Sequence, residues 1–223
     1  MGDDRAWRRH RFRRGPTRCL DPAARAYARL VLVVIPFRGG GKTRLPQAVR
    51  REVALAMLGD VVESASAVGD VLVVTDDSAG RLVATELGAA VVDDPGEGQG
   101  AAVAAGLRGS EEICLVLNAD VPRARPSDLG ALAVPPKRGA VAVVAARDGT
   151  TNALGLPYAE VFQPLYGPGS AGRFRAHARA LAVPLEDLAL RNLVDDVDTI
   201  ADLERIGPRA GARTRALVAA IAR

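Results

Sequence analysis

The chain has 223 residues, which is enough for one domain with a sizeable core and short tails. Its two cysteines, Cys19 and Cys114, and its two histidines exclude a disulfide framework and a zinc-type cluster, and they favour a reducing cytoplasm. The net charge of +4 is unevenly placed: residues 1–29 hold nine arginines and three aspartates, a net +6, so the rest of the chain carries −2.

The Arg-rich leader, residues 1–29, precedes the first apolar segment. It has three interpretations: a disordered or spuriously assigned extension, an arm that contacts nucleic acid, or a targeting segment. We favour the first and expect no nucleic-acid partner. No apolar run approaches the roughly 20 residues of a membrane span. We therefore expect a soluble, cytoplasmic protein with no membrane partner.

Apolar segments alternate with helical patterns from residue 30 to residue 206. We expect strands at 30–35, 71–75, 89–92, 113–118, 140–145 and 152–156. We expect helices at 47–68, at 78–87 with Ser78 as N-cap, at 101–107, at 171–182 and from about Thr199. Residues 207–223 are expected to form a loosely attached helical tail. The alternation predicts a single α/β domain over 30–206, Rossmann-like, with a mainly parallel sheet.

The first predicted strand runs into the sequence GGGKTRL, residues 39–45. A Walker phosphate loop would need glycine at position 36, where this chain has Pro36, and Pro46 would disrupt the helix that follows such a loop. We therefore reject a Walker loop. A glycine-rich loop with Gly41, Lys42 and Arg44 can still wrap a triphosphate, although a solvated loop cation is the simpler alternative for Lys42.

Three aspartates are candidate metal ligands. Asp120 follows the fourth predicted strand, where side chains project into the ligand crevice of an open α/β sheet. Asp196 and Asp198 point to the same side of an extended segment. If the three converge, they form a Mg²⁺ site of the kind that also uses substrate phosphates. The alternative, in which Asp198 or Thr199 only caps the last helix, explains part of this cluster.

A third group of residues suits a small anion. Thr151, Gly167 and Ser170 can offer hydroxyl and backbone N–H donors, with Ser170 at a helix N-terminus, and Arg173 and Arg175 add positive charge nearby. Gly-Pro-Gly-Ser is also an ordinary turn followed by an N-cap.

Taken together, these motifs resemble the CofC/FbiD family of guanylyltransferases over about residues 31–206. The motifs are K-T-R-L after the first strand, E-G-Q-G-A-A after the third, N-A-D-V-P after the fourth, and then D-G-T-T-N-A-L, F-Q-P-L-Y-G-P-G-S and D-D-V-D-T. Three features depart from the usual family pattern: Gln99-Gly100 replaces a Leu-Asn pair, Val121 replaces leucine, and G-G-G-K replaces a small-residue A-K segment.

The resemblance implies a nucleotidyltransferase fold of the glycosyltransferase-A type and a step in the biosynthesis of coenzyme F(420). The substrates it implies are GTP and a small phosphorylated carboxylic acid: phosphoenolpyruvate, 2-phospho-L-lactate or 3-phospho-D-glycerate. The phosphate of the acid would attack the α-phosphorus of GTP and release pyrophosphate.

The resemblance also implies roles for individual residues. The metal ligands would be Asp120, Asp196 and Asp198 with Mg²⁺. Thr151, Gly167 and Ser170 match the residues that hold phosphoenolpyruvate in one branch of the family, which favours that acid. Nucleotide contacts would come from Gly41, Lys42, Gln99 and Gly100, and the catalytic set from Lys42, Arg44 and Asp120.

Two alternatives stay open. The first is another nucleotidyltransferase of the same fold, acting on a sugar 1-phosphate or a molybdopterin. The second is a non-catalytic protein that binds nucleotides or nucleic acid. The sequence also leaves open whether the protein forms a homodimer.

Overall fold

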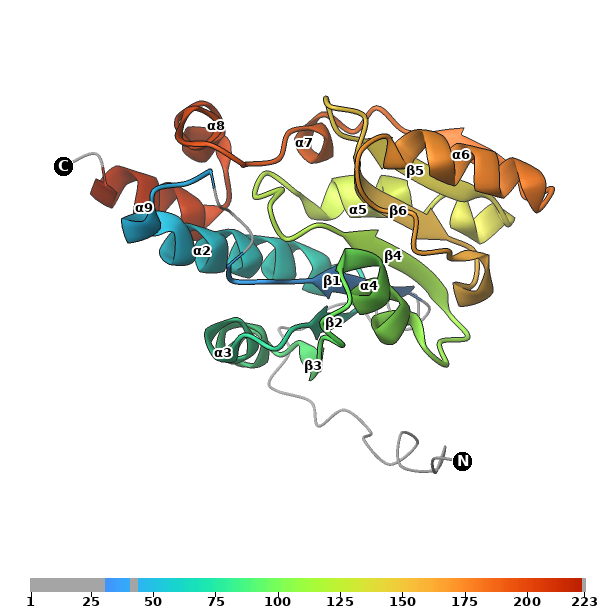
Figure 1. Cartoon of the computed structure of the whole chain (residues 1–223), viewed down its shortest axis with the longest axis horizontal. Coiled ribbons are helices and arrows are strands. Elements are labelled where there is room, and N and C mark those ends of the chain that lie inside the picture. The colour runs from blue at the N-terminus through green and yellow to red at the C-terminus, as the bar shows by residue number, and fades with distance from the viewer. Residues whose placement is uncertain (1–30, 41–43, 222–223) are drawn as a thin grey trace.

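The computed structural model describes residues 31–40 and 44–221 (Figure 1). The Arg-rich leader and the predicted nucleotide-binding residues Gly41 and Lys42 lie outside the described residues.

Within the described residues, seven strands form one sheet in the order β3-β2-β1-β4-β6-β5-β7. The strands are β1 (Val31–Pro36), β2 (Asp70–Val74), β3 (Ala90–Val92), β4 (Ile113–Leu117), β5 (Val141–Ala145), β6 (Thr151–Leu156) and β7 (Leu185–Asp187). Four neighbouring pairs are parallel, and only β6 runs antiparallel to its neighbours β4 and β5. The predicted mainly parallel sheet is confirmed.

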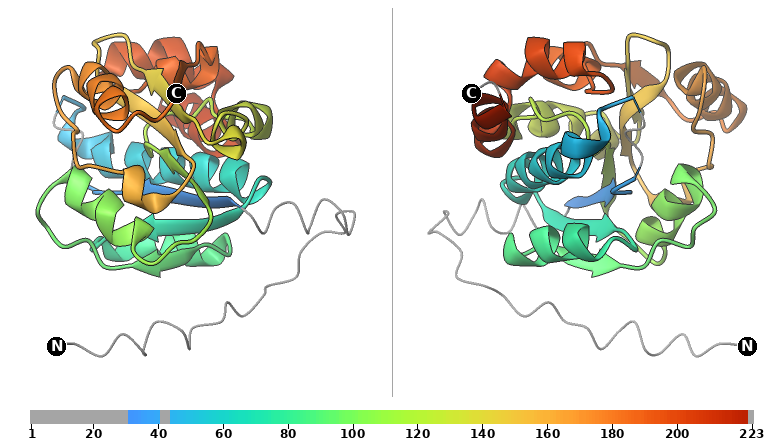
Figure 2. Two further views of the ribbon diagram at one scale, coloured as in Figure 1. Left: turned by 90° about the vertical axis from the view of Figure 1, so that its right-hand side faces the viewer. Right: turned by 60° about the vertical axis from the view of Figure 1, so that its left-hand side comes forward.

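Helices cover both faces of this sheet (Figures 1 and 2). They are α2 (Gln47–Ser66), α3 (Ser78–Glu86), α4 (Gln99–Leu107), α5 (Pro126–Leu132), α6 (Ser170–Ala180), α7 (Arg191–Val194), α8 (Ile200–Ile206) and α9 (Ala212–Ile221), with short 3-10 turns at Pro136–Arg138, Ala159–Val161 and Gly207–Arg209. No helix of the described part is both long enough and apolar enough to cross a membrane.

The period-two alternation of β1 explains the two layers of core. Val33 and Ile35 pack with α2, α3 and α5 on one face, and Leu32 and Val34 pack with α4 and α6 on the other. Because both faces are covered, the strand is apolar throughout, as is typical of a central parallel strand.

One predicted N-cap was wrong by one residue, and one predicted helix start was wrong by two. Asp77, and not Ser78, is the N-cap of α3, because its carboxylate accepts the N–H of Gly80 at 2.8 Å. Helix α4 begins at Gln99 and not at residue 101, because Gly98 takes a left-handed φ of 102° that turns the chain into the helix.

The C-terminal helix is not loosely attached, in contrast to the prediction. Helix α9 lies along α2 (Figure 1), and the carboxylate of Asp60 on α2 accepts the backbone N–H groups of Arg213 and Thr214, both at 2.9 Å. Asp60 is only 4% exposed. A buried carboxylate thus caps the helix N-terminus, a contact between residues more than 150 positions apart that a local sequence pattern cannot reveal.

Candidate active site

The predicted functional residues that the structure describes gather at one edge of the sheet. Strands β1, β3 and β4 end there, and the antiparallel β6 begins there, since Leu117 at the end of β4 pairs with Ala153 near the start of β6. Loops that follow parallel strands form the usual ligand crevice of such a sheet.

The three predicted metal ligands meet in space. Asp120, Asp196 and Asp198 each place a carboxylate oxygen within 4.8 Å of the other two. A backbone hydrogen bond of 3.0 Å from Val197 to the carbonyl of Asp120 joins the loop after β4 to the extended segment before α8. The two segments are therefore fixed against each other by the main chain.

Helix capping does not account for this cluster. Thr199 is the N-cap of α8 and accepts the N–H of Asp202, while the carboxylate of Asp202 accepts the N–H of Thr199 in return. The cap is complete without the carboxylates of Asp196 and Asp198. Three hard oxygen ligands from two segments fit a divalent cation that keeps positions for substrate phosphates.

Arg44 lies beside the acidic cluster. Its Nη1 is 4.0 Å from Oδ2 of Asp198, and its side chain is 75% exposed. The guanidinium can therefore reach the crevice and remains accessible to an anionic ligand.

The residues predicted to hold a small anion also come together. Oγ1 of Thr151, at the start of β6, and Oγ of Ser170, at the start of α6, lie 3.0 Å apart, and both side chains are buried. Gly167, in the turn before α6, has a φ of 108°, which an L-residue rarely adopts.

The two arginines near this turn do not provide free charge for an anion. The guanidinium of Arg173 donates to the carbonyls of Leu165, Tyr166 and Pro168, and so fixes the loop that carries Gly167. Arg175 instead pairs with Asp187 on the far edge strand.

A chain of amide side chains joins the residues predicted to bind the nucleotide to those predicted to bind the acid, and the sequence alone did not predict this chain. Gln99 donates to Asn118 at 2.7 Å, and Asn118 donates to the carbonyl of Thr151 and to Asn152. Asn152 in turn donates to the carbonyls of Leu193 and Val194 in α7. The position of Asn118 just after a buried strand was the available signal.

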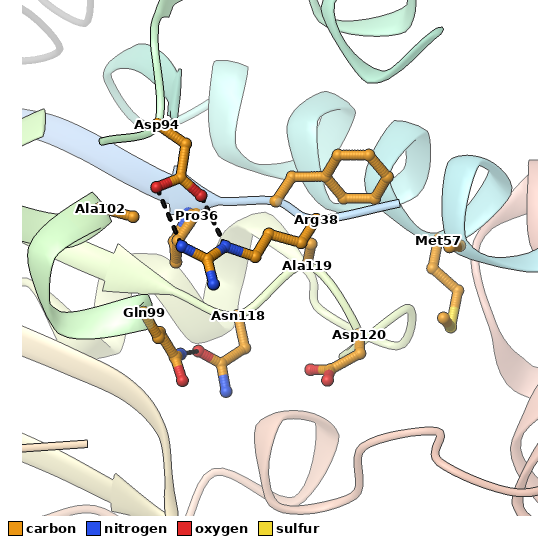
Figure 3. Close-up of a pocket in the computed structure, with 11 residues that line it drawn as sticks. Pro36, Arg38, Met57, Asp94, Gln99, Ala102, Asn118, Ala119 and Asp120 are labelled. Carbon is orange, nitrogen blue, oxygen red and sulfur yellow. Dashed lines mark hydrogen bonds and ion pairs between the residues drawn. The ribbon is translucent and has the colours of Figure 1, made fainter. Parts of the chain in front are cut away.

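A cavity of about 210 Å³ extends from Asp120 past Gln99 and Asn118 to Arg38 (Figure 3). Arg38 forms a bidentate ion pair with Asp94, with Nε–Oδ2 at 2.6 Å and Nη2–Oδ1 at 3.1 Å. The hydrogen bonds from Arg38 hold the pKa of Asp94 below its usual range, and the same pair raises the pKa of Arg38. Sequence reasoning missed both residues, although each follows a strand that ends at this edge.

A second missed group lies next to the acidic cluster. The carboxylate of Asp195, 6% exposed, contacts the guanidinium groups of Arg123, Arg147 and Arg205. The hydrogen bond from Arg147 is the main cause of the lowered pKa of Asp195. The chain therefore surrounds one aspartate with positive charge and leaves its neighbours Asp196 and Asp198 beside Asp120.

Comparison with known proteins places the chain in a family. Residues 39–201 match the model of the MobA-like NTP transferase domain. The chain is 38% identical to phosphoenolpyruvate guanylyltransferase of Streptomyces scabiei, covering 85% of this chain and 95% of the relative. It is 36% identical to the phosphoenolpyruvate guanylyltransferase of Thermomonospora curvata, covering 85% and 88%.

The fold is also similar to a solved structure from Desulfovibrio desulfuricans G20, described as a nucleotide-diphospho-sugar transferase. The TM-score is 0.69 at 15% identity, with 87% of this chain and 96% of that chain covered. At this identity the likeness concerns the fold alone, whereas the sequence relatives show the family. The chain belongs to the phosphoenolpyruvate guanylyltransferase family and carries a MobA-like NTP transferase domain.

Proposed function

We propose that this protein is a phosphoenolpyruvate guanylyltransferase: it joins GMP from GTP to the phosphate of phosphoenolpyruvate and releases pyrophosphate. The observation that carries the proposal is the convergence of Asp120, Asp196 and Asp198 at the sheet edge where β6 begins with Thr151, whose buried hydroxyl contacts Ser170. The names of the relatives support the same reaction. The step in coenzyme F(420) biosynthesis that the resemblance implies is part of this proposal.

The reaction needs little covalent help from the protein. An oxygen of the phosphoenolpyruvate phosphate forms a bond to the α-phosphorus of GTP, and the bond from that phosphorus to pyrophosphate breaks. The attacking oxygen is already an anion, so no general base is assigned. The protein's task is to place two anions in line and to offset their repulsion.

We assign the metal site to Asp120, Asp196 and Asp198 and the metal to Mg²⁺. Bound there, Mg²⁺ would supply positive charge to the triphosphate and to the attacking phosphate. Arg44 contributes a further positive charge to the same crevice, and Lys42 stays a prediction from the sequence.

We assign the acid site to Thr151, Gly167 and Ser170. The hydroxyl groups of Thr151 and Ser170 form its floor, and the start of α6 favours an anion above them. Arg173 fixes the loop that carries Gly167, so the geometry of the site is held before substrate enters. Gln99 and Gly100, at the start of α4, are assigned to the nucleotide. Cytoplasmic location stays a prediction, and monomer and homodimer both stay open.

The test is pyrophosphate release by the full chain with Mg²⁺, each of the four common ribonucleoside triphosphates, and a panel of phosphoenolpyruvate, 2-phospho-L-lactate, 3-phospho-D-glycerate and glucose 1-phosphate. We expect turnover with GTP and phosphoenolpyruvate, and a product whose mass equals their sum minus pyrophosphate. Turnover with the sugar phosphate and with none of the phospho-acids would reject the proposal.

A matched pair of variants tests the acid site. Thr151→Val removes the hydroxyl at nearly constant shape and should raise KM for phosphoenolpyruvate with little change in KM for GTP. Thr150→Val is the control, because the neighbouring hydroxyl bonds to Asp148 and not to Ser170. Equal effects of the two substitutions would contradict the assignment.

A further inference from the structure

The cavity beside the acidic cluster has two chemically different ends. One end contains Asp120 of the proposed metal site, and the other contains Arg38, Asp94 and Gln99 (Figure 3). Its volume of about 210 Å³ is below the roughly 300 Å³ at which pockets for drug-sized ligands begin. It therefore suits one ring system. If the proposed function holds and the phosphates lie at Asp120, the nucleobase lies at the Arg38 end.

The guanidinium of Arg38 lines this cavity. Its Nε and Nη2 are engaged with the two oxygens of Asp94, which leaves both N–H groups of Nη1 and one of Nη2. Nη1 forms no hydrogen bond or ion pair with any of the residues that the structure describes. Figure 3 shows the group between Asp94 and the Gln99–Asn118 pair.

Asp94 fixes the direction of that guanidinium. The side chain of Asp94 is 1% exposed, and its Oδ1 also accepts the N–H of Gly96 at 2.9 Å. A carboxylate held on both sides and removed from solvent binds the arginine in one orientation, whereas a surface ion pair would let it move. Of the three remaining N–H groups of Arg38, the parallel pair on Nη1 and Nη2 thus forms a preorganised pair of donors.

We propose that Arg38 reads the guanine base of the nucleotide, with Nη1 and Nη2 donating to O6 and N7, and that Asp94 is the positioning residue for this contact. Guanine presents two adjacent acceptors on this edge, and arginine is their usual partner. Adenine would place its N6 amino donor against the guanidinium, and cytosine would present its N4 amino group. The inference rests on the proposed function and deepens it by naming the residue that selects GTP.

The first test uses the unaltered full chain with Mg²⁺ and phosphoenolpyruvate. We compare kcat/KM for GTP, 7-deaza-GTP, which lacks the N7 acceptor, and ATP. We expect kcat/KM to be roughly tenfold lower for 7-deaza-GTP than for GTP, because one of the two hydrogen bonds is removed. For ATP we expect kcat/KM to be lower still. Equal values for GTP and 7-deaza-GTP would overturn the proposal without any change to the protein.

The second test changes the arginine. Arg38→Ala should lower kcat/KM for GTP by roughly 10- to 100-fold, leave ATP almost unchanged and abolish the penalty for 7-deaza-GTP. Arg38→Lys keeps the charge but not the paired donors, so it should lose the same discrimination. Asp94→Asn should raise KM for GTP with kcat nearly constant, and it should reduce the ratio of kcat/KM for GTP to kcat/KM for 7-deaza-GTP. If Asp94 had only a structural role, this ratio would not change.

Arg81→Ala is the matched control. Arg81 pairs with Asp93, the neighbour of Asp94, but does not line the cavity, so the ratio of GTP to ATP turnover should not change. A GTP to ATP ratio in Arg38→Ala equal to that of the unaltered protein would also overturn the proposal. If the unaltered protein releases no pyrophosphate from GTP and any phospho-acid, the proposed function fails. Stabilisation against heat by GTP relative to 7-deaza-GTP then still tests Arg38.

Discussion

The acidic cluster makes a prediction that separates metal binding from folding. Without metal, Asp120, Asp196 and Asp198 repel one another. At an effective dielectric of about 20, two charges 4.8 Å apart repel by about 3.5 kcal/mol. The side chain of Asp198 is 42% exposed and lies 4.0 Å from Arg44. Screening by solvent and by this arginine therefore reduces the repulsion that Asp198 contributes to about 1 kcal/mol.

We therefore expect Asp198→Asn to stabilise the metal-free protein while removing its response to metal. For a domain of this size, about 1 kcal/mol corresponds to a rise of about 2–4 °C in the unfolding midpoint. Mg²⁺ at 100 times its Kd would stabilise the unaltered protein by about 2.7 kcal/mol, or about 5–10 °C. Asp198→Asn should lose most of that shift and its metal-dependent turnover.

The assay is thermal unfolding in EDTA and across a Mg²⁺ titration, with Asp187→Asn as control. Asp187 is a half-exposed carboxylate on β7, paired with Arg175, and its substitution should leave both the midpoint and the Mg²⁺ response within error. A metal-free midpoint below that of the unaltered protein, together with an undiminished Mg²⁺ shift, would refute the view that these carboxylates repel until a cation joins them.

Three further outcomes follow from the contacts. The hydrogen bond from Arg147 lowers the pKa of Asp195 in the folded protein, so this carboxylate stabilises the fold above its unfolded pKa of about 3.9. The stabilisation is lost as the pH falls through the folded pKa. Asp195→Asn should therefore lower the urea midpoint at pH 7 and should have the same midpoint as the unaltered protein near pH 2. Arg173→Ala should raise KM for phosphoenolpyruvate about tenfold, the equivalent of one charge-assisted hydrogen bond of about 1.5 kcal/mol, while KM for GTP stays constant; equal changes in both would contradict a local role. Asp60→Ala should cost about 2–3 kcal/mol in urea unfolding with unchanged kcat, because it removes the two hydrogen bonds that cap α9; a loss of kcat at full folding would contradict a purely structural contact.

Local patterns were enough to predict most of the sheet. They left the meeting of the three aspartates as a condition, and the family resemblance supplied the full set of metal ligands. The apolar run that became β4 ends at Leu117, so Asp120 had to lie at the carboxyl edge. What the sequence could not give was pairing over long separations. Short elements such as β7, α5 and α7 were missed because three to seven residues carry too little periodicity.

The same limit applies within the site. Arg38 and Asp94 are 56 residues apart, and nothing in either segment indicates that one neutralises the other. Arg173 was interpreted as charge for an anion, because composition shows that a cation is present but not which acceptor it meets. The structure assigns it three backbone carbonyls. Charges near a site can thus be counted from sequence, whereas their partners cannot.

The segment Asp195-Asp196-Val197-Asp198 shows how one local rule organises the electrostatics of the whole edge. Side chains of an extended chain alternate, so Asp195 and Val197 turn inward, at 6% and 0% exposure, while Asp196 and Asp198 face Asp120. Asp195 then pairs with Arg123, Arg147 and Arg205 next to Asp196 in the chain. Three guanidinium groups face two carboxylates there, those of Asp195 and of Asp202, which also pairs with Arg205. The remaining net positive charge lowers the cost of holding three carboxylates together before a cation arrives. Asp195, through the arginines that it binds, thus reduces the repulsion that Asp196 and Asp198 meet beside Asp120. Loss of Asp195 should therefore weaken metal binding, although Asp195 binds no metal itself.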